Sequence, residues 1–150
     1  MEITTALVCN WAEVREGILF VSGGGITRAW KQSFPAPFGV CLALVLEGTQ
    51  GEMIGIPHDV EIEVTTADGE QVGQVTAGIQ ANGSPDLEPG ETLQVPLAFN
   101  LNMLPLPLPG AYDINVRIDR GSVAGQPERV LAIRALVAPE PPSAPEPAPE

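Results

Sequence analysis

Only a few residues of this 150-residue chain have the types and spacing that could support chemistry. Three acids, Asp59, Glu61 and Glu63, alternate along a predicted strand and therefore lie on one face of it. Such a row could bind Ca²⁺ or act as an acid–base pair, but Ca²⁺ sites use ligand-rich loops, which we do not find in the neighbouring sequence. We interpret the row as a solvated strand face that keeps a sheet soluble.

The single histidine and the two cysteines do not complete a site. His58 has no accompanying GxSxG or HExxH motif to supply a nucleophile or a metal, so we expect a surface histidine. Cys9 and Cys41 each lie in an apolar run, which favours two buried thiols over a disulfide or a zinc site. We therefore predict no catalytic residue, no cofactor and no metal.

A glycine-rich segment at residues 22–28 (SGGGITR) is the most conspicuous local motif. Backbone N–H groups in such a loop could face an anion, with Arg28 beside it. No Lys-Ser/Thr pair follows as in a P-loop, and no GxGxxG pattern is present. A tight turn or a bulge, where glycine tolerates positive φ, explains the same residues.

Aromatic side chains around a proline-rich turn are the strongest indication of a binding surface. Trp30, Phe34, Pro35, Pro37 and Phe38 make an apolar loop that could contact a protein partner. The alternative is that this loop packs over one end of the fold. We retain it as the candidate partner-binding loop.

The charge balance limits the classes of partner. Nineteen acids against seven bases give a net charge of −12. Nucleic acids and anionic membranes are bound by Lys and Arg, so we expect neither as a partner. Residues 32–116 contain eleven acids and no Lys or Arg, which predicts an acidic side that faces solvent or a basic protein.

The fold class follows from Gly, Pro and short alternating runs. Sixteen Gly and sixteen Pro argue against helix bundles. Period-two alternation between turn signals, as at residues 59–66 and 111–118, predicts an all-β fold. We expect a single antiparallel immunoglobulin-like β-sandwich of about seven to nine strands. One short helical turn is expected at residues 10–15 (NWAEVR).

Alternation also predicts which side chains enter the core. Residues 38–47 are apolar almost throughout, as in a central strand covered on both faces. Tyr112, after Pro-Gly at a strand start, should bond its hydroxyl to backbone as in a tyrosine corner. The expected core residues are Val60, Ile62, Val64, Cys41, Ala43, Val45, Ile114, Val116 and Ile118.

The chain divides into a folded part and a tail. Residues 138–150 (APEPPSAPEPAPE) contain six Pro, three Glu and no large apolar residue. Such a segment cannot bury enough surface to offset its ordering entropy, so we predict a disordered Pro/Ala/Glu tail after a β-sandwich domain at residues 1–137. Its PxxP frame could instead dock on an aromatic groove.

Several segments resemble one known group of proteins. These are residues 3–30 (ITTALVCNWAEVREGILFVSGGGITRAW), with their GGG turn before a Trp, then FPAP at 34–37 and PGAY at 109–112. Over about residues 3–137 the chain is similar to an uncharacterised family of small bacterial proteins, a domain of unknown function. The resemblance implies an all-β sandwich and carries no activity, cofactor or site residue.

These observations favour a non-enzymatic structural or protein-interaction module. We find no secretory signal and no apolar run long enough to span a membrane, so we expect a cytoplasmic adaptor. It would bind a protein partner, or itself, through the Trp30–Phe38 loop or a free sheet edge. Two alternatives stay open: a phage virion accessory protein, such as a capsid decoration or tail component, and a carboxylate-based hydrolase or lyase.

Overall fold

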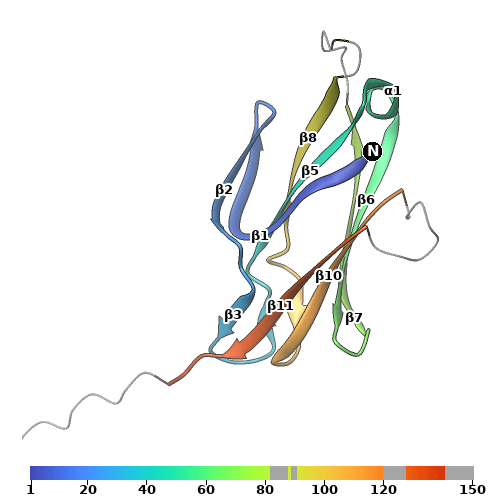
Figure 1. The fold of residues 1–150 in the computed structure, drawn as a ribbon. Coiled ribbons are helices and arrows are strands. Elements are labelled where there is room, and N and C mark those ends of the chain that lie inside the picture. Colours follow the sequence, from blue (N-terminus) through green and yellow to red (C-terminus); the bar gives the residue numbers. More distant parts are fainter. Residues whose placement is uncertain (82–87, 89–90, 120–127, 141–150) are drawn as a thin grey trace, which may run out of the picture.

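Two β-sheets packed face to face make up the structure, a computed structural model that describes residues 1–81, 88, 91–119 and 128–140 (Figure 1). The first sheet has the order β2 (Ile18–Gly24), β1 (Glu2–Arg15), β5 (Cys41–Thr49), β8 (Thr92–Asn100). The second has the order β3 (Arg28–Lys31), β11 (Arg129–Val137), β10 (Gly110–Ile118), β6 (Pro57–Thr66), β7 (Gln71–Gln80).

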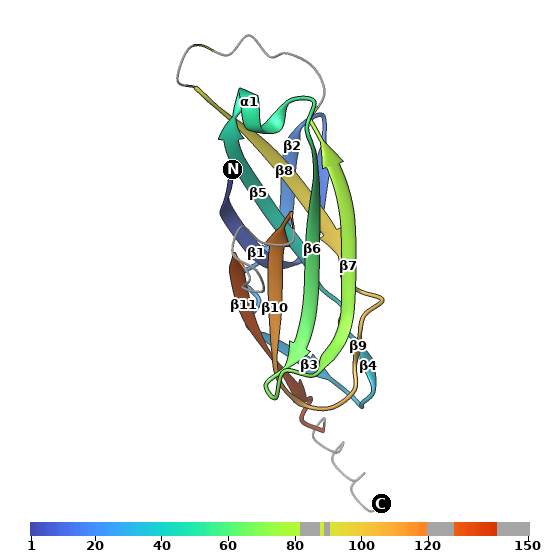
Figure 2. The same ribbon diagram turned by 90° about the vertical axis from the view of Figure 1, so that its right-hand side faces the viewer.

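Neighbouring strands in both sheets are antiparallel, except that β3 pairs parallel with β11. Two short strands, β4 (Ala36–Pro37) and β9 (Pro105–Leu106), pair near the end of the sandwich opposite the four-residue helix α1 (Gln50–Met53) (Figure 2). Within the described residues the two large sheets therefore hold nine strands, and the predicted all-β sandwich is confirmed.

The core lies between the two sheets. β6 contributes Val60, Ile62 and Val64 to it, as predicted, and the predicted residues of β10 are also buried. In β5 the face predicted to enter the core, that of Cys41, Ala43 and Val45, is wrong, and Val45 is only half-buried. Leu42, Leu44 and Leu46 fill the core, whereas Cys41 and Ala43 point to the opposite side of the first sheet. Because β5 is apolar on both faces, alternation could not tell one face from the other.

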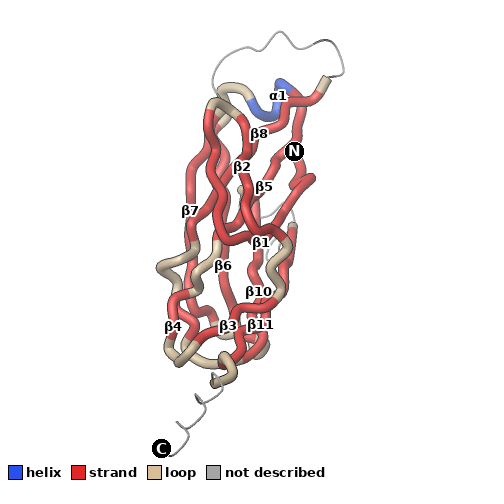
Figure 3. Tube along the Cα trace, turned by 90° about the vertical axis from the view of Figure 1, so that its left-hand side faces the viewer, coloured by secondary structure: helices blue, strands red, loops and turns tan. Residues whose placement is uncertain are grey.

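The predicted helical turn at residues 10–15 is also wrong, because β1 continues to Arg15 and forms a hairpin with β2. Glu16 and Gly17 close the hairpin with φ values of 51° and 76°, the left-handed conformations of a type I′ turn. The hairpin projects over the outer side of the first sheet (Figure 3). There, Ala12 and Leu19 pack against a small cluster of Cys9, Cys41 and Ala43.

The glycine-rich segment is a structural turn between the sheets. Gly23 and Gly25 have positive φ (62° and 84°), and a Cβ at Gly23 would collide with the side chain of Asn10. Gly25 donates its N–H to the Val8 carbonyl at 2.9 Å, after which the chain crosses to β3 in the second sheet. Glycine is therefore required here by backbone conformation and close packing.

Two further features were predicted from the sequence. The Tyr112 hydroxyl is buried and donates to the Leu108 carbonyl at 2.6 Å, which confirms the tyrosine corner. β11 ends at Val137, and Ala138 then donates its N–H to the Lys31 carbonyl at 2.8 Å. Of the predicted tail, residues 141–150 lie outside the described part of the chain. No helix in the described residues has the length and apolar character needed to span a membrane.

Candidate functional site

The predicted partner-binding loop is only partly exposed. Trp30 lies on β3 with 56% of its surface exposed, and Pro35 and Pro37 are exposed beyond it. Phe34 is half-buried against the core, and Phe38 is 0% exposed, so Phe38 cannot contact a partner and its placement in the loop surface is corrected. Phe38 begins the apolar run that continues into β5, and its side chain packs in the core with the residues of that strand.

The acidic row on β6 is partly compensated within its own sheet. Arg117 of the adjacent strand β10 places Nη1 3.2 Å from Glu61 Oε1 and 2.8 Å from Glu63 Oε2. The hydrogen bond to Glu63 raises the pKa of the guanidinium. In the described residues no group of three or more Asp, Glu, His or Cys is arranged to hold a metal ion.

Cys9 and Cys41 lie directly opposite each other on β1 and β5, and both are free and buried. Burial, and then the neighbouring Cys41, raise the pKa of the Cys9 thiol. A thiol whose pKa is raised is a poor nucleophile, because the thiolate is the reactive form. The geometry fits the prediction of two buried thiols.

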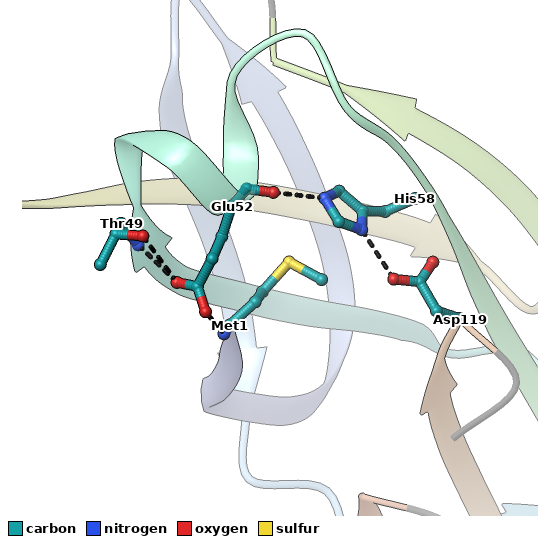
Figure 4. A network of polar contacts seen from close by, with 5 residues as sticks. All are labelled: Met1, Thr49, Glu52, His58 and Asp119. Carbon is teal, nitrogen blue, oxygen red and sulfur yellow. Dashed lines mark hydrogen bonds and ion pairs between the residues drawn. The ribbon is translucent and has the colours of Figure 1, made fainter. Parts of the chain in front are cut away.

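His58 is the centre of a polar network, shown in Figure 4, at the α1 end of the sandwich. Its side chain is only 10% exposed, so the prediction of a surface histidine is wrong. Nδ1 lies 2.7 Å from Asp119 Oδ2, and Nε2 lies 2.7 Å from the Glu52 carbonyl oxygen. Both neighbours are acceptors, so only the imidazolium, with two N–H donors, satisfies both contacts.

The pKa shifts in this network agree with its geometry. The hydrogen bond to Asp119 is the main cause that raises the pKa of His58. The pKa of Asp119 is lowered on balance: burial opposes ionisation, but the His58 contact and the Asp59 N–H, at 2.9 Å, favour it. The network thus holds an ion pair between His58, at the start of β6, and Asp119, which directly follows β10.

Glu52 joins the same network to the first residue of the chain (Figure 4). Its carboxylate accepts the Thr49 N–H at 2.8 Å and the Met1 amino group at 2.9 Å. The Thr49 backbone bond is the largest of the effects that lower the pKa of Glu52 to about 2. We did not predict this site from the sequence, although Thr49 and Glu52 have the spacing of a capping box.

A cavity of about 430 Å³ adjoins the network, lined by Met1, Gly51, Glu52, Ile56, His58, Ile118, Asp119 and Glu128. Acids therefore converge on His58, which is the arrangement that the hydrolase alternative needs. However, both ring nitrogens of His58 and the carboxylates of Glu52 and Asp119 are engaged in contacts. Glu128, whose pKa is raised mainly by burial, is the remaining acid, and the described residues of the lining include no Ser, Thr, Cys or Lys nucleophile.

The largest run of exposed apolar side chains lies on the β1–β2 hairpin. Trp11, Ile18 and Phe20 are 47%, 59% and 44% exposed. The register pairs Trp11 with Ser22, Glu13 with Phe20 and Arg15 with Ile18, which puts all three apolar side chains on one face. We call Trp11, Ile18 and Phe20 the hairpin face. The sequence analysis missed it, because a helical turn was expected in place of the second half of β1.

Comparisons with known proteins place the chain in a family but assign it no chemistry. No curated protein and no solved structure matches the chain. Residues 4–130 match a family of unknown function, DUF6941, over a span that runs from β1 into the start of β11. The resemblance to an uncharacterised family is thereby confirmed, and the chain belongs to this family of unknown function, DUF6941.

Proposed function

We propose that the chain is a non-catalytic protein-interaction module, an adaptor whose main contact surface is the hairpin face. The exposure of Trp11, Ile18 and Phe20 is the observation that supports this most strongly. Aromatic residues on a rigid backbone are the typical anchors of protein interfaces, and here they share their face with the charged residues Glu13 and Arg15.

The polar groups support the same proposal. Arg117 is committed to Glu61 and Glu63, and His58 is committed to Asp119 and a carbonyl. These contacts hold strands and α1 together, and they leave no described nucleophile beside a free base. Trp30 and the exposed prolines of the predicted loop form a second candidate surface, at the opposite end of the sandwich from α1 (Figure 1).

Site-specific cross-linking tests the proposal. A photoreactive phenylalanine replaces Phe20 in the full chain, produced in its native host, and the same replacement at Val130 serves as the control. Val130 is an exposed apolar residue (53%) on the second sheet. We expect a discrete adduct from position 20 after irradiation. Equal adduct patterns from positions 20 and 130 would show that the hairpin face is not the contact surface.

A further inference from the structure

In the strand order of the two large sheets, four strands lie at the edges: β2 and β8 in the first sheet, and β3 and β7 in the second. An edge strand presents unpaired backbone N–H and C=O groups, which can pair with a strand of another chain. Natural proteins prevent this with charged residues, proline or short length. The four edges differ in this protection.

Two edges are protected by their sequences. β8 contains Pro96, which lacks an N–H donor, and β3 has four residues, of which Arg28 and Lys31 are charged. Each of these features opposes the addition of a further strand. Neither β8 nor β3 is therefore suited to edge-to-edge pairing.

β7 has no charged residue or proline, but its surroundings are acidic. On the adjacent strand β6, Asp59 lies opposite Gly78 of β7, and Asp68 and Glu70 lie in the turn that leads into β7. Two copies paired through β7 would bring these acids together. Like charges on facing surfaces oppose association, and the outward residues of β7, such as Gln74, are polar.

β2 is the edge without such protection. Its sequence, ILFVSGG, has no charge and no proline, and six of its seven residues are exposed. Of the nearby charges, Arg15 and Glu13 form an ion pair at 3.1 Å and cancel, and Glu16 lies in the hairpin turn, beyond the end of the strand. In a chain with a net charge of −12, this neutral, apolar edge is where a second acidic copy can approach with little repulsion.

We propose that β2 pairs with β2 of a second copy, antiparallel across a two-fold axis. This inference rests on the proposed function and names its partner. The two hairpins would join into one antiparallel sheet in the order β1-β2-β2-β1, because β2 pairs with the half of β1 that follows Cys9 and β5 pairs with the half before it. A two-fold axis makes the contact self-complementary, because the same surface is used by both copies.

The hairpin geometry sets the register of this pairing. In a two-residue hairpin closed by Arg15 and Ile18, the backbone groups of Leu19 and Val21 point away from β1. With the axis at Phe20, Leu19 of one copy pairs with Val21 of the other, and the two Phe20 residues face each other. Facing aromatic side chains stabilise antiparallel strand pairs.

The contact is small, since it uses one seven-residue strand and a few half-exposed side chains. Interfaces below about 1,200 Å² belong to the weak and transient class. We therefore expect a dimer that dissociates in the micromolar range and is seen only as the concentration is raised.

Sedimentation velocity of the full chain, from about 5 to about 500 µM, tests the dimer over a range that brackets micromolar dissociation. We expect the wild type to shift from monomer to dimer mass. Phe20→Lys, which puts a charge on the exposed edge, should stay monomeric, and the matched control Val130→Lys should dimerise like the wild type. A monomeric wild type at all concentrations overturns the inference, as does a Phe20→Lys protein that dimerises equally well.

A second variant tests the register. Facing residues that are not hydrogen-bonded to each other lie about 4.5 Å apart at Cα, a distance that a disulfide can span. Under mild oxidation Phe20→Cys should form an intermolecular disulfide, and Val130→Cys should not. If the wild type is monomeric while cross-linking from position 20 captures another protein, the dimer fails and the interaction module stands. If that cross-linking also fails, both proposals fail.

Discussion

The His58 contacts predict a stability that depends on pH. His58→Gln removes the imidazolium, which is the group that can donate to Asp119 and to the Glu52 carbonyl at once. Hydrogen bonds to charged groups contribute about 1.5–3 kcal/mol each. Asp119 is half-exposed and also accepts the Asp59 N–H, so we expect a smaller sum, about 2 kcal/mol at about pH 5.5.

The sign of the pH dependence follows from the raised pKa of His58. The contribution is fully present below the unfolded pKa, about 6.5, and is lost as the pH rises through the higher folded pKa. A neutral ring can still donate from one nitrogen. The difference between wild type and His58→Gln should therefore fall to about 1 kcal/mol or less on the alkaline side.

Urea unfolding of both proteins across this pH range measures the difference. The Met1–Glu52 pair is present in both and cancels in the subtraction. His58 is the only histidine, so its proton NMR signal also reports the folded and unfolded pKa directly. A folded pKa at or below the unfolded value, or a difference that grows with pH, would refute the reasoning.

Four further predictions concern other parts of the structure. Glu52→Gln should lower the Tm at pH 6, and the deficit should shrink as the pH falls from about 4.3 towards 2, since the pKa of Glu52 is lowered to about 2. Leu44→Ala should reduce the free energy of unfolding by about 2–5 kcal/mol in chemical denaturation, because Leu44 is fully buried; a loss below about 1 kcal/mol would contradict its core position. Gly23→Ala should cost about 1 kcal/mol or more by the same measurement, through its positive φ and the clash with Asn10, and an unchanged stability would contradict the strain. A chain that ends after Glu140 keeps the Ala138–Lys31 hydrogen bond and should melt within a few degrees of the full chain; a larger fall would show that residues 141–150 pack on the body.

Strand positions were predictable where one face of a strand is polar. β6 and β10 alternate apolar and polar residues, so Val60 and Ile114 could be assigned to the core from sequence. β5 is apolar on both faces, and its phase depends on the hairpin that covers Cys41 and Ala43 from outside. That cover is a tertiary feature, which no local pattern encodes.

The candidate surfaces were harder to predict for a related reason. Trp30 could be identified as an exposed aromatic residue, but Phe38 was misplaced because it begins the run that leads into β5. The hairpin face depends on the turn at Glu16 and Gly17, where both residues adopt positive φ. This turn pairs β1 with β2, two segments that the sequence analysis had not connected. The His58 contact joins residues 61 positions apart, a distance at which sequence spacing gives no signal.

The parallel pairing of β3 with β11 has a consequence for synthesis on the ribosome. β3 is at an edge, and its neighbour in the sheet is β11, so residues 28–31 have no strand to join until residues 134–137 are made. The first sheet, in contrast, has all four strands once residue 100 has been made. At that point the second layer has β6 and β7 but lacks β10 and β11, so the nascent chain leaves part of the inner face of the first sheet uncovered until the last two strands are made.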